Sequence, residues 1–296
     1  MSEFILSCCS TVDLPEEVIK ARNLNFIPFH YILGDKEYVD DLGKSITYEK
    51  FYEAMEKGAM TKTSQVSVGE YMDYFSKFLE AGKDILHVTL STGISGTYNS
   101  AITAASMLKE KYPNNKIYIV DSKGASSGYG LFMDKLADLR DEGKSIEEIR
   151  DFAEANKLKL NHWFFSTDLK YYVRGGRISK TSGFFGSLLK ICPLLNMDNN
   201  GKLIPREKIR TIKKVEQEIY QKMVECADNG LDYDGKVFIS ESNCMDYAKA
   251  VAKLVEDNFK HIKGGKVEIY SIGTTIGAHT GPGTVALFFW GKERTN

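Results

Sequence analysis

The first half of this chain alternates apolar segments of strand length with amphipathic segments of helix length. An apolar run at 85–90 is followed by a glycine-containing turn and a helix pattern at 97–112, and the next apolar run, at 116–121, is followed by small residues and a further helix pattern. Parallel strands need a long crossover connection, usually a helix, so this alternation predicts a mainly parallel sheet with helices on both faces. Ligands of such sheets bind beyond the carboxyl ends of the strands. We therefore expect the loops at 91–97 and 122–130 to open on the same side.

The second half of the chain has a different pattern. An Asn199-Asn200-Gly201 turn separates two arms of a hairpin, and further strands are expected at 267–272 and 284–290. Strands joined by a hairpin beside helices predict a smaller, mixed α/β domain. We therefore expect an α/β fold of two domains, an N-terminal domain at 1–160 and a C-terminal domain at 161–296.

The bulk composition is typical of a globular protein. Of the 296 residues, 43% are hydrophobic and 27% are charged. The chain has no apolar run long enough to cross a bilayer and no basic, apolar leader, so a cytoplasmic protein is expected. Its five cysteines have no CxxC spacing, and its histidines do not supplement them at ligand spacing. We expect free thiols in a reducing compartment and no metal site.

Positive charge is concentrated in one segment. Residues 170–214 contain eleven Lys and Arg but only two acidic residues, whereas the whole chain has a net charge of −1. Such a block indicates a negatively charged partner or surface, and the alternative is a solvated face. Its aromatic residues occur as pairs at 171–172 and 184–185 and do not alternate with its bases as in a single-strand stacking site, and it has no recognition-helix motif, so nucleic acid is not the expected partner.

Two polar loops are candidates for an anion site. The first contains Thr63-Ser64-Gln65, and the second, at 91–98, lies between a predicted strand and a predicted helix. The N-terminus of a helix has unpaired N–H groups and partial positive charge, so it favours anions. Hydroxyl groups there, without a fixed cation, suit a small anionic group such as a carboxylate. For Ser95 the alternative is a simple turn or cap residue.

Five motifs resemble those of the DegV family and occur in the family order. They are Ser-Thr-Val-Asp-Leu-Pro at 10–15, Thr-Ser-Gln at 63–65, the loop at 91–98, Arg-Gly-Gly-Arg-Ile-Ser at 174–179 and the glycine-rich segment at 276–284. The resemblance implies a two-domain α/β protein that binds a long-chain fatty acid. In many bacteria such proteins hold the fatty acid while a separate ATP-dependent fatty acid kinase phosphorylates its carboxyl group.

The resemblance also assigns roles to single residues. It places the carboxylate of the fatty acid on Thr63 and Ser95. His279 lies among glycines that suggest close backbone approach, and it is either a further carboxylate ligand or a structural histidine. Four more residues are expected to support the head group: Ser64, Gly93, Thr97 and Ser126. One departure is Cys9, which stands where the family usually has Asp.

Two further groups of residues are expected to act outside the head-group site. Four arginines of the basic block are predicted to dock the kinase: Arg174, Arg177, Arg206 and Arg210. The apolar run at 183–195 is either plain core or a movable lid that also touches a membrane surface transiently, and the lid residues would be Phe184, Phe185, Leu188 and Leu189.

The sequence therefore predicts a binding protein without catalytic residues, cofactor or metal. Its partners would be a long-chain fatty acid and the kinase, with no nucleic acid. The first alternative is a stand-alone lipid carrier. The second is a Ser-dependent acyl hydrolase, in which Ser95 would be the nucleophile and His279 the base. Against the hydrolase, Gly93-Ile94-Ser95-Gly96 lacks the spacing of a nucleophile elbow, and no motif nominates an acid.

Overall fold

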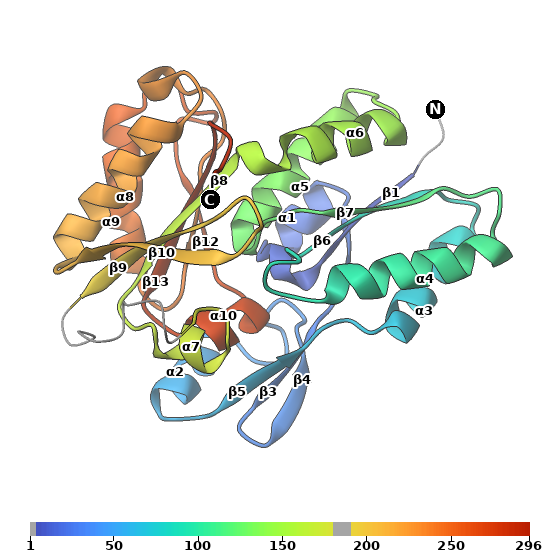
Figure 1. Cartoon of the computed structure of the whole chain (residues 1–296), viewed down its shortest axis with the longest axis horizontal. Coiled ribbons are helices and arrows are strands. Elements are labelled where there is room, and N and C mark those ends of the chain that lie inside the picture. Colours follow the sequence, from blue (N-terminus) through green and yellow to red (C-terminus); the bar gives the residue numbers. More distant parts are fainter. Residues whose placement is uncertain (1–3, 180–190) are drawn as a thin grey trace.

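The structure is a computed structural model that describes residues 4–179 and 191–296, and its strands form three sheets (Figure 1). Sheet A has the order β2-β1-β6-β7, sheet B the order β4-β3-β5, and sheet C the order β10-β9-β8-β13-β11-β12. This arrangement confirms the predicted α/β fold with a parallel and a mixed sheet. The strands of sheets A and B are β1 (Ile5–Cys9), β2 (Asn25–Ile27), β3 (His30–Leu33), β4 (Lys36–Val39), β5 (Thr61–Ser64), β6 (Ile85–Thr89) and β7 (Ile117–Asp121).

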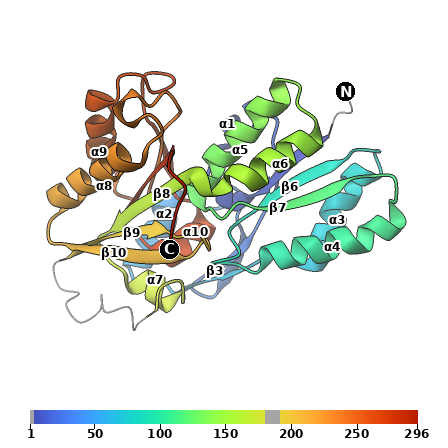
Figure 2. The same cartoon turned by 45° about the horizontal axis from the view of Figure 1, so that its top comes forward.

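Sheet A is parallel throughout and has helices on both faces. Every residue of β6 is buried, as expected for a strand that is covered on both sides. Figures 1 and 2 show α3 and α4 on one face and α1, α5 and α6 on the other. Capping boxes begin α3 at Ser67 and α6 at Ser145. The bounds are α1 (Glu16–Ala21), α3 (Val68–Leu79), α4 (Thr97–Lys111), α5 (Ser126–Asp141) and α6 (Ile146–Asn156).

Sheet C lies between two layers of helices. Helices α8 and α9 pack on its outer face, whereas α5 packs on its inner face and so joins sheet C to sheet A. The predicted hairpin is confirmed, because β9 and β10 pair antiparallel around Gly201. The bounds are β8 (Leu160–Ser166), β9 (Cys192–Met197), β10 (Leu203–Ile209), β11 (Phe238–Glu241), β12 (Glu268–Ser271), β13 (Thr284–Trp290), α8 (Ile212–Cys226) and α9 (Met245–Asn258).

Sheet B forms a small aromatic core with helices from both ends of the chain. Helix α2 (Tyr48–Glu56), α7 (Lys170–Arg174) and α10 (Thr274–Thr280) pack on it through Tyr31, Phe51 and Tyr171. The Thr61 hydroxyl donates to the Ala278 carbonyl oxygen at 2.9 Å, which fixes α10 against β5. Within residues 4–179 and 191–296 there are also short 3-10 turns at η1 (Ser10–Val12), η2 (Lys157–Lys159) and η4 (Gly230–Asp232).

The structure changes the local assignments of Thr63 and Ser126 and adds a helix at His279. Thr63 lies in strand β5 and not in a loop, and His279 lies between β12 and β13, as predicted, but in helix α10. Ser126 is the first residue of α5 and not part of a long loop. In each case packing against another sheet stabilises an element that the local sequence indicates only weakly.

Candidate ligand-binding site

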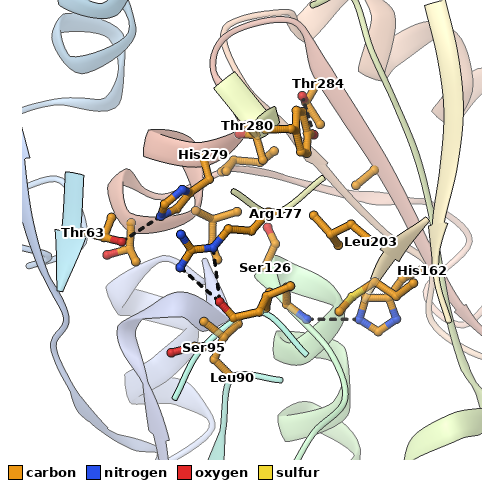
Figure 3. Close-up of a pocket in the computed structure, with 18 of the residues that line it drawn as sticks. Thr63, Leu90, Ser95, Ser126, His162, Arg177, Leu203, His279, Thr280 and Thr284 are labelled. Carbon is orange, nitrogen blue, oxygen red and sulfur yellow. Dashed lines mark hydrogen bonds between the residues drawn. The ribbon is translucent and has the colours of Figure 1, made fainter. Parts of the chain in front are cut away.

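A cavity of about 610 Å³ lies where the three sheets meet (Figure 3). Its walls come from both halves of the chain, with Leu90 and Ala125 following strands of sheet A and Phe164 and Ala286 lying in sheet C. The volume is within the range of roughly 300–1,000 Å³ that small-molecule sites occupy. The predicted position is thus correct in one respect, since the cavity lies at the carboxyl ends of β6 and β7.

One end of the cavity is polar. The Nε2 atom of His279 lies 2.7 Å from the Thr63 hydroxyl oxygen, and both side chains are partly buried. Burial, with the nearby positive charges of Arg177 and Arg174, lowers the pKa of His279 to about 3. The imidazole is therefore neutral at physiological pH, and this pair can donate hydrogen bonds without adding charge.

Ser95 approaches the same end from the loop before α4. Its hydroxyl oxygen accepts a hydrogen bond from the Thr97 N–H at 3.3 Å, the turn role expected of a serine before a helix. The hydroxyl hydrogen remains available to a ligand, because accepting a bond does not consume it. Ser95 lines the cavity together with Thr63 and His279, so the structure brings the three predicted carboxylate ligands together.

A hairpin turn holds this loop in place. The Ser91 hydroxyl donates to the Gly201 carbonyl oxygen at 2.9 Å. Gly201 has a φ of 73°, and a side chain there would meet the Ser91 hydroxyl at 2.0 Å. Glycine therefore permits both the turn and the contact, through which the hairpin of sheet C positions the anion loop of sheet A.

Arg177, which the sequence predicted as a kinase-docking residue, brings a cation into the cavity lining. Its guanidinium donates to the Ile94 carbonyl oxygen at 3.2 and 3.1 Å and to the Gly175 carbonyl oxygen at 2.6 Å. Figure 3 shows it between His279 and Ser95. Burial lowers its pKa, but an arginine remains charged. Arg177 was expected on an outward docking surface, whereas its hydrogen bonds hold it in the cavity wall.

The four supporting residues have different positions. Ser64 is exposed and lines the cavity, and Ser126 is buried and also lines it. Gly93 instead packs against the Gly201 carbonyl group. Thr97 is buried in the core of sheet A, where its hydroxyl oxygen lies 2.9 Å from Tyr71 Oη. Gly93 and Thr97 thus shape the loop from behind.

Two buried carboxyl groups lie beneath the cavity. Asp40 accepts hydrogen bonds from the hydroxyl groups of Thr274 and Thr275 at 2.9 and 2.7 Å, and Asp13 lies 2.5 Å from the Ser126 hydroxyl oxygen. Burial raises the pKa of both aspartates above the usual range. Ser126 and Thr275 line the cavity, so the hydrogen bonds of these aspartates fix two of its lining side chains.

The rest of the cavity wall is largely apolar. The main apolar contributors are Leu90, Phe164, Met197, Leu203, Ala286 and Phe288. The sequence carries no local signal for this wall, because β8 and β13 are buried on both faces and therefore show no alternating pattern. A site with hydroxyl groups and an arginine at one end and apolar side chains beyond suits an amphipathic anion.

Comparison with known proteins agrees with this geometry. Residues 9–292 match the family model whose description reads "Uncharacterised protein, DegV family". The chain belongs to the DegV family. A DegV domain-containing protein of Clostridium perfringens is 35% identical over 294 residues, 99% of each chain.

Two solved structures of DegV-type proteins resemble this one closely. A DegV lipid binding protein from Thermotoga maritima has a TM-score of 0.83 at 27% identity and covers 100% of both chains. The Fatty Acid Kinase (Fak) B3 protein of Streptococcus pneumoniae, loaded with linoleic acid, has a TM-score of 0.83 at 25% identity and covers 99% of this chain and 100% of its own.

Cys9, the departure from the usual DegV motif, does not line the cavity. It is fully buried, with its sulfur 3.4 Å from Tyr71 Oη and 3.7 Å from His87 Nε2. Burial raises the pKa of Cys9 to about 11, and burial lowers the pKa of His87 to about 3. A neutral thiol beside a neutral imidazole is a structural contact and not a reactive pair.

The other predicted residues of this DegV protein lie outside the cavity. Arg174 and Arg210 are exposed, and Arg206 donates to Asn196 Oδ1 at 2.8 Å on the edge of sheet C. The predicted lid, Phe184, Phe185, Leu188 and Leu189, lies outside the described residues. Within 4–179 and 191–296, no three His, Cys, Asp or Glu side chains form a metal-binding group, and no helix of that part is long and apolar enough to cross a membrane.

Proposed function

We propose that this DegV protein binds one long-chain fatty acid between its two domains, residues 1–160 and 161–296. The observation that carries the proposal is a cavity with a polar end at Thr63, Ser95 and His279 and apolar walls beyond them. The names of the similar structures support it, since one is a lipid binding protein and another is loaded with linoleic acid.

The head group is bound by neutral donors and one cation. With its hydrogen on Nε2, the neutral His279 donates to the Thr63 oxygen, so the Thr63 hydroxyl can donate in turn to the carboxylate. Ser95 donates from the other side. The charge of Arg177 compensates the carboxylate, because an unpaired carboxylate in a buried site carries a large desolvation cost.

The tail is bound by removal of apolar surface from water. Each buried methylene group contributes about 0.8 kcal/mol, so a long acyl chain supplies most of the affinity before association costs. The head group then determines the orientation of the ligand. This division fits a cavity in which Thr63, Arg177 and His279 lie together and apolar side chains line much of the rest (Figure 3).

We further propose that the protein presents the carboxylate to a separate ATP-dependent kinase and performs no chemistry itself. The similarity to the Fak B3 protein supports a partner kinase. Exposed bases such as Arg174 and Arg210 suit an acidic partner surface or a phosphate. The lid and its transient contact with a membrane surface stay predictions.

The two alternatives are less well supported. A Ser-dependent hydrolase needs a carboxylate that orients its histidine. The buried Nδ1 atom of His279 has no hydrogen-bond partner among the described residues, which argues against such a triad. A stand-alone lipid carrier would have the same cavity, and only its independence of a kinase distinguishes it.

Two experiments test the proposal in turn. Native mass spectrometry of the purified protein is expected to show a mass excess of one fatty acid per chain, and a bound nucleotide or sugar in its place would overturn the function. The lipid-loaded protein, incubated with a fatty acid kinase and ATP, is then expected to support acyl-phosphate formation. Lipid binding without any phosphorylation would favour the carrier.

A further inference from the structure

Two neighbouring strands of sheet C form a floor that runs along the cavity. In β8 and β13, Phe164 pairs with Ala286 and His162 pairs with Phe288, and all four side chains line the cavity. Thr284, at the start of β13, also lines it. Alternate residues of a strand share one face, so successive pairs on this floor are spaced by about 7 Å.

One end of this floor lies near His279, and the other end lies at the His162–Phe288 pair. Helix α10, which carries His279, leads through a three-residue connection into β13 at Thr284. Phe288 is four residues further along this strand, a distance of about 13 Å. Figure 3 shows His162 on the opposite side of the cavity from Thr63 and His279. The His162–Phe288 pair therefore lies at the end remote from Thr63 and His279 (Figure 3).

The histidine of this pair is fixed by the main chain. His162 Nδ1 lies 3.1 Å from the Leu160 carbonyl oxygen, and its Nε2 accepts from the Ala125 N–H at 3.4 Å. Burial lowers its pKa well below the usual value, so the ring is neutral. The ring meets that of Phe288 edge-on, with centroids 5.1 Å apart. Both ring nitrogens are hydrogen-bonded to the main chain, so the ring forms part of the cavity wall and offers no hydrogen bond to a ligand.

Helix α5 leaves no room behind the pair. A side-chain carbon at Gly128 would lie 2.3 Å from Phe288 Cδ1 and 2.6 Å from His162 Nε2. The glycine thus allows the helix backbone to press directly on both rings. Neither ring can withdraw toward α5 when a longer ligand enters, because packed interiors have few voids.

We infer that the His162–Phe288 pair is the stop that sets the longest acyl chain this protein accommodates. The inference rests on the proposed function, because it requires the carboxylate at the Thr63–His279 end. A chain that reaches the pair gains no further buried methylene groups, whereas each added methylene short of it increases affinity about fourfold. The pair is a specificity-determining element without any contact to the head group.

The test is the chain-length profile of binding by lipid-free protein. Saturated fatty acids from about twelve to about twenty carbons displace a fluorescent fatty acid, and the affinity is expected to rise about fourfold per methylene and then stop rising. In His162→Ala and Phe288→Ala the rise is expected to continue to longer chains. Phe288→Leu, a smaller change, decides the question if an alanine variant does not fold.

Phe289→Ala is the matched control. Phe289 is the next residue of the same strand and is equally buried, but it faces the core under α8 and α9. The Phe289→Ala variant should be less stable than the wild type but keep the wild-type chain-length profile of binding. The inference is overturned if the cavity variants stop at the wild-type length, or if Phe289→Ala shifts the profile equally. A wild-type protein that binds no fatty acid overturns the proposed function itself and the inference with it.

Discussion

The Nε2 atom of His279 lies 2.7 Å from the Thr63 hydroxyl oxygen, although the two residues are 216 positions apart. One belongs to strand β5 and the other to helix α10. Their contact depends on the packing of α10 against sheet B, which the bond from Thr61 to the Ala278 carbonyl group also secures. The Thr63–His279 contact therefore exists only when these two distant parts of the chain are assembled.

Removal of the Thr63 hydroxyl should weaken fatty acid binding. Thr63→Val keeps the branched shape that suits a strand and removes one donor to a charged acceptor, so we expect a loss of about 1–3 kcal/mol. Ser95→Ala should have an effect of similar size. Displacement of a fluorescent fatty acid measures both. Lys62→Ala, at an exposed neighbour of Thr63 that does not line the cavity, is the control, and full affinity in the Thr63, Ser95 double variant would exclude this head site.

Loss of the Arg177 charge should affect anionic ligands selectively. Arg177→Met is expected to weaken fatty acid binding by about 1.5–3 kcal/mol, because a charged donor is lost from a partly buried site. Binding of a fatty alcohol of equal length should change far less. Arg174→Met is the matched control, since Arg174 belongs to the same motif but is exposed. Equal losses for alcohol and acid would instead indicate a collapsed cavity wall.

Local sequence patterns predicted the loop around Ser95 and the hairpin, because short-range signals determine both. The strand, turn and helix around Ser95 follow from an apolar run, a glycine and a helix pattern, and the hairpin follows from Asn200-Gly201. The sequence does not predict helix α10, because Thr274, Thr275 and Gly277 are weak helix formers. Packing on sheet B stabilises that helix, so only the fold could bring His279 to Thr63.

The position of Arg177 could not be predicted for a similar reason. A count of charges over 170–214 cannot distinguish an exposed arginine from one whose guanidinium is bound by main-chain oxygens. The carbonyl groups that hold Arg177 belong to Ile94 and Gly175, and the Ile94 contact is long range. Similarly, no pattern connects His162 with Phe288 until strands β8 and β13 are paired.

The buried His87 should make stability fall in mild acid. Its folded pKa of about 3 is below the unfolded value of 6.5, so between these pH values only the unfolded chain binds the proton. The free energy of unfolding should fall by about 1.4 kcal/mol per pH unit as pH decreases below about 6.5. Urea unfolding of wild type and His87→Asn from pH 7 to 4 measures the difference, and parallel curves would contradict this assignment.

The buried Arg294 should be essential for stability. Its guanidinium donates to the carbonyl oxygens of Asp198 at 3.2 Å and Lys123 at 2.8 Å, and so joins the hairpin to the loop after β7. Arg294→Met should lower the free energy of unfolding by about 1–3 kcal/mol, since buried acceptors lose their donor. Urea unfolding measures the loss. Lys292→Met, at an exposed residue nearby, should change stability little, and equal effects would refute the assignment.

The exposed bases should act on the kinase and not on the lipid. Arg210 is exposed, whereas Arg206 uses its Nε–H within the sheet edge, so Arg210→Ala should impair phosphorylation more than Arg206→Ala does. Neither variant should change fatty acid affinity. Electrostatic association weakens with salt, so the wild-type advantage should be largest at low ionic strength. Phosphoryl transfer to lipid-loaded protein is measured at low and high salt. Wild-type rates for both variants at low salt would make this surface a solvated face, and loss of lipid from Arg210→Ala would assign the arginine to the pocket.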